Sequence, residues 1–127
     1  GEGLAAEAVR LHSLRDRLHA ELATQAGQVS LNGHPTERLP NTLNVSFAGI
    51  DGEALLARTP EIAASTGSAC HAGRTEPSAV LLAMGVSPDL ALGAVRLSLG
   101  RWTTQEEVDQ VVLLLTEGVT ALRGEVT

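Results

Sequence analysis

The chain has 127 residues, which is enough for one domain with a single hydrophobic core. Its net charge is −6, its nine basic residues are all arginine, and it holds one Phe, one Trp and no Tyr. This balance argues against nucleic acid or an anionic membrane surface as the main partner, because both need basic patches and the former also uses stacking aromatics. No apolar run approaches the roughly 20 residues of a membrane-spanning helix.

The first third of the chain predicts a helix and two strands. Apolar residues recur at three- and four-residue steps over residues 4–24, which is typical of an amphipathic helix. Its expected apolar stripe is Leu4, Ala8, Leu11, Leu14 or Leu18, and Leu22, with Arg10, Arg15, Asp16 and Arg17 in solvated positions. Residues 28–32 predict a short strand. Residues 42–48 alternate between apolar and polar side chains and predict a half-buried strand.

The middle of the chain predicts short elements. Asp51 is a capping residue for a helix that runs through Arg58, and residues 61–65 predict a short strand. This strand leads into a glycine-rich loop. Pro77 suits the first turn of a helix that ends at Met84, and residues 88–92 predict another helical turn.

The last third predicts one strand and one helix. Residues 94–99 alternate again, with Arg96 and Ser98 on the polar face. Thr104 and Glu107 form a capping box that opens the final helix. Its expected apolar stripe is Val108, Val111, Val112, Leu115, Val119 and Leu122. Half-polar strands with short connections predict an α+β fold: a two-layer sandwich in which helices cover a small mixed or mostly antiparallel sheet. We expect a single domain over residues 1–127.

Cys70 is the only cysteine, and it lies among small and polar residues in the glycine-rich segment 65–73. A free cysteine is most often a small buried apolar residue, but no apolar periodicity places Cys70 on a core face. A functional thiol is therefore an equal hypothesis, and His71 or Arg74 would favour its thiolate. His71 itself is better explained as an exposed loop histidine, because neighbours in an extended segment point in opposite directions.

One cysteine and four histidines at positions 12, 19, 34 and 71 match no zinc-ligand spacing, so we expect no metal site. A lone cysteine is typical of a reducing compartment, and we predict a cytoplasmic protein.

Arg96 is the second residue of interest. An arginine on a strand is usually a solvated surface residue. A guanidinium held on a rigid strand is, however, also the group in this sequence best suited to bind a substrate carboxylate through two parallel hydrogen bonds. Arg101 is expected to be a surface charge. Asn41 is most simply a turn residue, and Asn44 faces the polar side of its strand, where it can form a hydrogen bond across the sheet.

Four blocks of the sequence carry a family resemblance. They are residues 39–47 (LPNTLNVSF), 65–70 (STGSAC), 76–85 (EPSAVLLAMG) and 94–104 (AVRLSLGRWTT). In this order and at these spacings they resemble the small domain of the cysteine desulfurases, and the Ala-Cys-His step is similar to that of the selenocysteine lyases. Both belong to the class V aminotransferase group of pyridoxal-phosphate enzymes of fold type I.

The resemblance implies that L-cysteine is converted to L-alanine while a persulfide forms on Cys70, and that Arg96 holds the substrate α-carboxylate. Selenocysteine is the alternative substrate. It also implies a homodimeric full-length enzyme that passes sulfur to an acceptor such as an iron–sulfur scaffold protein. No family role is assigned to His71, which stands where the family commonly has a small polar residue.

The chain contains no lysine, so it cannot supply the Schiff-base lysine that holds pyridoxal phosphate. In the family that lysine lies in a large domain that precedes this segment. The resemblance therefore implies a C-terminal small domain whose cofactor-binding domain is absent, and we expect the isolated chain to be inactive. The alternative is a stand-alone sulfur carrier that holds a persulfide on Cys70 without cofactor.

Overall fold

The computed structural model describes residues 2–33, 41–67, 69–71, 74–101 and 103–126, and these ranges contain five helices and six strands. In chain order they are α1 (Glu2–Gln25), β1 (Val29–Leu31), β2 (Thr42–Phe47), α2 (Gly52–Arg58), β3 (Ala64–Ser65), β4 (Ala69–His71), β5 (Arg74–Glu76), α3 (Ala79–Ala83), α4 (Pro88–Leu92), β6 (Ala94–Ser98) and α5 (Gln105–Val126). Among the described helices, none combines the length and apolar composition that crossing a bilayer requires.

Four strands form one antiparallel sheet in the spatial order β1-β2-β6-β3, and β4 pairs with β5 in a separate two-stranded ribbon. In the central pair, Leu43 lies opposite Leu97 and Val45 lies opposite Val95. Residues directly opposite each other share a face, and all four of these side chains are buried. The residues between them therefore point to the other face of the sheet.

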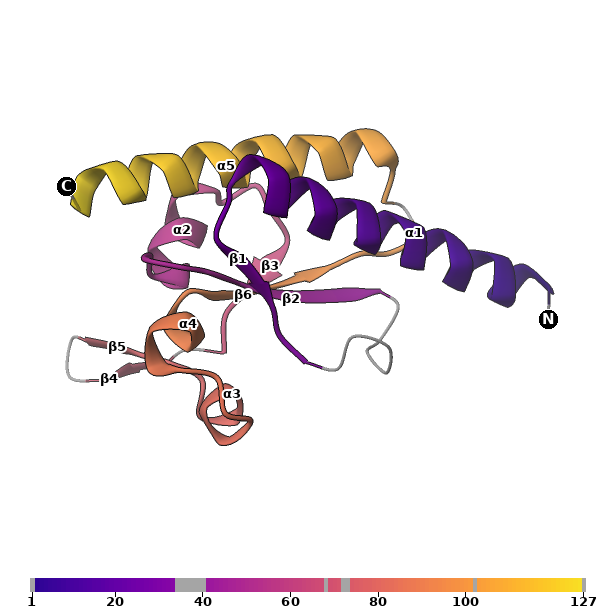
Figure 1. Cartoon of the computed structure of the whole chain (residues 1–127). Helices are drawn as coiled ribbons and strands as arrows, with labels where there is room; N and C mark the ends of the chain where they lie inside the picture. Colours follow the sequence, from indigo (N-terminus) through magenta and orange to yellow (C-terminus); the bar gives the residue numbers. More distant parts are fainter. Residues whose placement is uncertain (1, 34–40, 68, 72–73, 102, 127) are drawn as a thin grey trace.

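The long helices α1 and α5 lie side by side over the apolar face of the sheet (Figure 1). The core that joins them to the strands includes Leu11, Leu14, Leu18, Leu22, Leu43, Val45, Phe47, Val95, Leu97, Val108, Val112, Leu115 and Val119. On the surface, Arg17 of α1 and Asp109 of α5 form an ion pair, with 3.0 Å between Nε and Oδ1. The apolar stripes of the two helices thus account for the helical layer.

Two helices begin at the residues that the sequence indicates. Asp51 caps α2, where its carboxylate accepts a hydrogen bond from the backbone N–H of Glu53 at 2.8 Å. Thr104 precedes α5, and its hydroxyl oxygen accepts from the N–H of Glu107 at 3.1 Å. Both bonds satisfy a backbone donor that has no partner within the helix.

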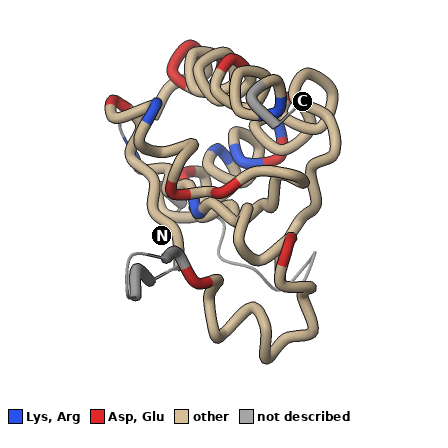
Figure 2. Tube along the Cα trace, turned by 90° about the vertical axis from the view of Figure 1, so that its left-hand side faces the viewer, with Lys and Arg blue, Asp and Glu red and all other residues tan. Residues whose placement is uncertain are grey.

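The opposite side of the sheet carries α3, α4 and the β4–β5 ribbon (Figure 1). A small apolar cluster of Leu81, Ala91 and Ala94 joins α3 and α4 to the start of β6. Residues 77–93 contain one charged residue, Asp89, and α3 is free of charge in Figure 2. The two short helices are therefore weakly charged, and together with the ribbon they form a small cover on this side of the sheet.

Gly93 allows α4 to end directly against β2. The backbone N–H of Phe47 donates to the carbonyl oxygen of Gly93 at 3.0 Å, and a Cβ at Gly93 would overlap the carbonyl oxygen of Phe47. Only glycine leaves room for the two backbones at this distance. The contact fixes the cover to the sheet.

The predicted α+β fold class is confirmed, and the sheet is antiparallel throughout its described strands. Two expectations for α1 are wrong. Leu4 is 77% exposed and Ala8 is also exposed, because the first turns of α1 extend past the sheet (Figure 1). Arg15, expected in solvent, is only 2% exposed, since it lies next to Leu14 on the buried side of the helix.

Three further expectations, all in the middle of the chain, need correction. The predicted loop around Cys70 contains a strand, because Ala69–His71 pairs with Arg74–Glu76 in antiparallel register. Pro77 is not in the first turn of α3. The helix begins after Ser78, whose hydroxyl oxygen faces the N–H of Leu81 at 3.4 Å, and a serine cap satisfies a backbone donor that proline does not. The strand predicted over residues 61–65 is confined to Ala64–Ser65.

Candidate functional site

A row of polar residues crosses all four strands on the face of the sheet opposite the long helices. Asn44 of β2 lies opposite Arg96 of β6, and Arg96 lies opposite Ser65 of β3. At the end of β1, the backbone N–H of Asn32 donates to the carbonyl oxygen of Asn44 at 2.9 Å, which extends the row to the first strand. Asn32, Asn44, Arg96 and Ser65 form what we call the polar row. It arises because directly opposed residues of an antiparallel sheet share a face.

A hollow of about 260 Å³ opens over the middle of the polar row, and we call it the sheet hollow. It is lined by Asn44, Thr66, Gly67, Ser78, Val80, Leu81, Ala94 and Arg96. The strands β2 and β6 form its floor, and the segment 66–67 and the start of α3 form its walls. Among the described residues of the lining, Arg96 is the one cation and none carries a carboxylate, so the hollow suits an anionic group.

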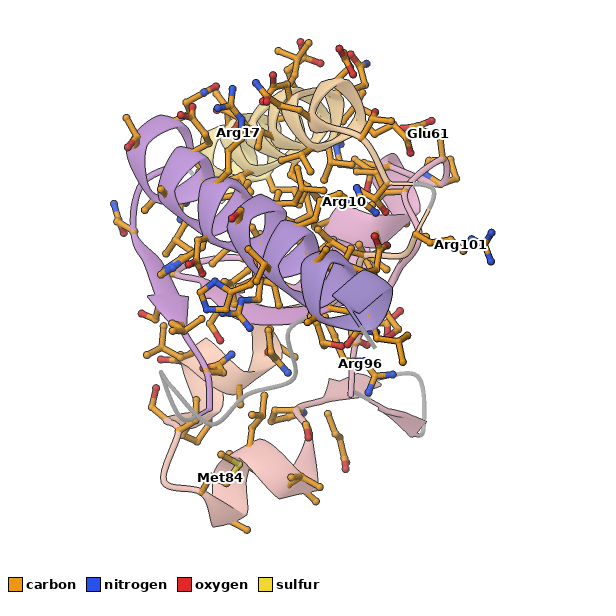
Figure 3. The ribbon with its side chains drawn as sticks, turned by 90° about the vertical axis from the view of Figure 1, so that its right-hand side faces the viewer. Arg10, Arg17, Glu61, Met84, Arg96 and Arg101 are labelled. Carbon is orange, nitrogen blue, oxygen red and sulfur yellow. The ribbon has the colours of Figure 1, made fainter. Side chains whose placement is uncertain are left out.

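Arg96 is exposed, and Figure 3 shows its side chain directed away from the long helices. Val95 and Leu97, its neighbours on the strand, are buried against the helical layer, which sends Arg96 to the other face. Within the described part of the chain, the structure gives its guanidinium no hydrogen bond or ion pair. Its five N–H donors are thus available to a ligand that enters the sheet hollow.

Asn44 is held by a residue that the sequence did not single out. The Nδ2 of Asn32 donates to Oδ1 of Asn44 at 3.0 Å and to Oγ of Ser46 at 2.8 Å. Asn32 is 8% exposed and Ser46 is fully buried, so these bonds are largely shielded from water. The expected hydrogen bond of Asn44 across the sheet is confirmed. The sequence did not indicate this role of Asn32, because Asn32 follows a strand of only three residues. So short a strand shows no clear alternation of apolar and polar side chains.

The segment that leads to Cys70 is fixed at two points. The hydroxyl of Thr66 donates to a carboxylate oxygen of Glu53 in the first turn of α2. A Cβ at Gly67 would lie 2.9 Å from both Cβ and Oγ of Ser78, so this segment packs tightly on the start of α3. These contacts set the direction in which the chain enters β4.

Cys70 itself lies in β4, with its backbone paired opposite Thr75. The placement of its thiol, and of the imidazole of His71, lies outside the described residues. The structure therefore brings Arg96, Asn44 and the segment that leads to Cys70 together around the sheet hollow.

The turn that follows the strand of Arg96 is held by α1. The guanidinium of Arg10 donates to the backbone carbonyl oxygens of Thr103 at 2.6 Å, Arg101 at 3.0 Å and Gly100 at 3.3 Å. Glu7 accepts two further bonds from Arg10, and these bonds hold the pKa of the Glu7 carboxyl below its usual value. Arg101 is exposed, as expected of a surface charge, and its backbone is part of this turn.

Comparison with known proteins places the chain in a family. The model of the family "Aminotransferase class-V" matches residues 2–111. A cysteine desulfurase IscS from Anaeromyxobacter sp. (strain Fw109-5) is 50% identical over 119 residues, which are 94% of this chain and 30% of that protein. A cysteine desulfurase IscS from Acinetobacter baumannii (strain AYE) is 43% identical over 123 residues, again covering 30% of its length.

Solved structures agree on the fold. A NifS-like protein superposes with a TM-score of 0.78 at 32% identity and covers 94% of this chain and 30% of its own. A second NifS-like protein, from Rickettsia africae ESF-5, has a TM-score of 0.74 at 23% identity and supports the fold alone. The chain spans about 30% of the length of the relatives that it matches. Because the family model covers most of its residues, the chain belongs to the class V aminotransferase family.

Proposed function

We propose that this chain is the sulfur-accepting part of a cysteine desulfurase, with Cys70 as nucleophile and Arg96 as the group that binds the substrate α-carboxylate. The observation that carries the proposal is the sheet hollow, which the guanidinium of Arg96 lines. Among the described residues, this guanidinium has no partner and the hollow is lined by no carboxylate. The segment that enters the strand of Cys70 forms one wall of that space. The similarity to cysteine desulfurases supplies the reaction.

The proposed step transfers one sulfur atom. The thiolate of Cys70 attacks the sulfur of L-cysteine, an S–S bond forms, and the C–S bond of the substrate breaks. The electron pair of the broken C–S bond stays on carbon and takes up a proton, which forms a C–H bond. L-alanine then leaves, and the persulfide stays on Cys70. Arg96 holds the carboxylate during this exchange through charge-assisted hydrogen bonds, which orient the substrate sulfur.

Pyridoxal phosphate is the cofactor of the proposed enzyme, and it supplies the electron sink that makes the C–S bond of an amino acid labile. The residues of this chain do not fit it as a resident group. The sequence has no lysine, and the described residues of the sheet hollow offer a single cation, Arg96, and no amine. The lysine is proposed to lie in the remaining part of the full-length enzyme.

We also propose that the full-length enzyme is a cytoplasmic homodimer that passes the persulfide sulfur to an acceptor protein, such as an iron–sulfur scaffold. Selenocysteine is a second possible substrate, because its selenium occupies the position of the cysteine sulfur. The chain is proposed to be the C-terminal small domain, with the cofactor-binding domain outside it.

The proposal is tested by measuring alanine release from L-cysteine. We expect no alanine from the 127-residue chain with added pyridoxal phosphate, and we expect turnover from the whole desulfurase polypeptide that contains it. In that polypeptide Cys70→Ser abolishes turnover, and Arg96→Ala raises the KM for L-cysteine at least about tenfold. Undiminished turnover by the Cys70→Ser variant, or turnover by the isolated chain, would contradict the proposal.

A second function is a stand-alone sulfur carrier, favoured by the combination of an intact cysteine strand with the absence of lysine. Its test is to incubate the 127-residue chain with a small-molecule persulfide donor and to measure the intact mass. The carrier hypothesis predicts a gain of one sulfur atom that Cys70→Ser removes. No gain, while a control thiol gains sulfur under the same conditions, would exclude the carrier.

A further inference from the structure

Asn44 and Arg96 present donors to the same space. They lie directly opposite each other on the two central strands, and both line the sheet hollow. Directly opposed side chains in an antiparallel sheet stand about 5 Å apart at Cβ, which is close enough for both to reach one small ligand. An ionised carboxylate has two oxygens with about four lone-pair sites. A guanidinium that binds it bidentately occupies two of these sites, so a second donor can bind one of those that remain.

The orientation of the Asn44 amide is fixed from the far side of β2. Asn32 donates to Oδ1 of Asn44 from its own Nδ2, so the amide oxygen of Asn44 faces β1. The two polar atoms of an amide group lie on opposite sides of its axis, and the NH₂ group of Asn44 is therefore turned away from Asn32. In the polar row the residue on that side is Arg96.

The orientation matters because the two ends of an amide treat an anion in opposite ways. An NH₂ group donates to a carboxylate oxygen, while an amide oxygen in the same place would repel it. Asn32 is 8% exposed and shares its NH₂ group with the buried hydroxyl of Ser46, so turning the Asn44 amide would break a shielded hydrogen bond. Asn32 thus holds the donor end of Asn44 toward the hollow.

We propose that Asn44 is a second substrate-binding residue that donates a hydrogen bond to the α-carboxylate beside Arg96, and that Asn32 is the positioning residue that sets its orientation. This inference rests on the proposed function, because the carboxylate belongs to the amino-acid substrate. Arg96 supplies the charge, and Asn44 supplies a neutral donor. A carboxylate offers both residues an acceptor oxygen, whereas a carboxamide replaces one of its oxygens with an NH₂ donor. Residues on two adjacent strands therefore bind the α-carboxylate of the substrate.

The first experiment measures steady-state kinetics of the whole desulfurase polypeptide with L-cysteine. Asn44→Asp keeps the acceptor for Asn32 and replaces the NH₂ donor with a negative oxygen next to Arg96. We expect the KM to rise at least about tenfold while kcat changes less than about threefold. The matched control is Asn41→Asp, which makes the same chemical change at an exposed residue outside the sheet hollow and should alter KM less than about twofold.

The second experiment separates carboxylate recognition from a merely structural role. L-alanine and L-alaninamide are compared as inhibitors, since they differ only in the group that Asn44 and Arg96 are proposed to bind. The wild type should prefer L-alanine, and Asn44→Ala and Arg96→Ala should each reduce that preference at least about tenfold. Asn32→Ala should reduce it in the same direction by a smaller factor, because the amide is then free to turn.

The outcomes distinguish the inference from the proposed function. If Arg96→Ala removes the preference for L-alanine and both Asn44 variants leave it intact, Asn44 is structural and the inference is overturned while the proposed function stands. If Arg96→Ala also leaves the preference intact, the role proposed for Arg96 fails and the inference falls with it. Asn44→Ala adds no charge, so it keeps the test decisive if Asn44→Asp does not fold.

Discussion

At the scale of single residues, the segment that leads to Cys70 packs closely on α3 because Gly67 has no side chain. Gly67 is exposed, yet a Cβ there would lie 2.9 Å from Cβ and Oγ of Ser78, closer than carbon atoms ordinarily approach. Ser78 is buried and caps α3, so it has little room to move. The glycine thus sets how closely the segment before β4 packs on the cover of the sheet.

We predict that Gly67→Ala lowers the free energy of unfolding by about 1–3 kcal/mol, because the added methyl group overpacks this contact. The measurement is urea denaturation followed by circular dichroism. Gly100→Ala is the control, since its added Cβ meets open space. Equal stability of Gly67→Ala and Gly100→Ala would show that Ser78 yields easily and that the contact does not constrain the segment.

Residue by residue, the sequence predicted what alternation alone can reveal. The polar faces of Asn44 and Arg96 followed from the apolar residues on either side of them. The role of Asn32 did not follow, because it depends on which strand lies beside β2. Burial of Arg15 was missed for a related reason, since a helix covered by a sheet and a second helix buries a wider stripe than its leucines indicate.

At the scale of elements, Arg10 connects α1 to the turn between β6 and α5. Its guanidinium reaches three carbonyl groups of that turn, those of Gly100, Arg101 and Thr103. Within the turn, the hydroxyl of Thr103 accepts from the N–H of Gly100 at 2.8 Å. Lysine has a single ammonium group and cannot reproduce this fork. The turn fixes the end of the strand that carries Arg96.

We predict that Arg10→Lys speeds amide hydrogen exchange at Gly100 and Thr103 about tenfold, because the turn then opens more easily. Arg17→Lys is the matched control, since the guanidinium of Arg17 binds the carboxylate of Asp109 on α5 and not the carbonyl groups of the turn. If the exchange rates change equally in both variants, the substitutions loosen α1 as a whole. That result would contradict a specific role of the Arg10 hydrogen bonds in holding the turn.

The pair formed by Glu7 and Arg10 also predicts a pH dependence. The hydrogen bonds of Arg10 lower the pKa of Glu7 from the model-compound value of 4.5, so the folded state binds the Glu7 proton less readily than the unfolded state. The stabilisation is present above the unfolded pKa and is lost as the pH falls through the folded pKa. Glu7→Gln should therefore be less stable than the wild type near neutral pH, and the difference should vanish under acid conditions. A difference that stays constant with pH would contradict this pairing.

Sequence periodicity found most elements because each long helix and each central strand has a clear apolar face. It overestimated the buried part of α1, since periodicity does not show where the supporting sheet ends. It also missed the ribbon of β4 and β5, whose three-residue strands contain too few apolar residues to show alternation. Such short strands form because they pair with each other, and the alternation of residues within one strand does not predict that pairing.

At the scale of the whole molecule, the core between the two long helices and the sheet holds the site in place. The residues that point away from that core form the polar row, so the same strands carry the fold on one face and the site on the other. The fold class could be predicted because apolar and polar residues alternate along each central strand. The meeting of Asn44, Arg96 and Gly67 at one hollow was not, because it depends on the strand order β1-β2-β6-β3.

We predict that Leu115→Ala lowers the free energy of unfolding by about 2–5 kcal/mol, since Leu115 is fully buried in this core. Leu113→Ala is the control on the same helix, where the side chain is 47% exposed, and it should cost less than about 1 kcal/mol. Urea denaturation measures both. Similar losses for the two variants would mean that α5 does not pack on the sheet through the face that contains Leu115.

Cys70 is proposed to accept sulfur from L-cysteine. The sharpest test incubates the whole desulfurase polypeptide with L-cysteine labelled in its sulfur, alkylates the protein and maps the label by peptide mass spectrometry. We predict label on the peptide that contains Cys70, released by a reducing agent and absent from Cys70→Ser. Label on a different peptide, or equal label and alanine release in Cys70→Ser, would contradict it.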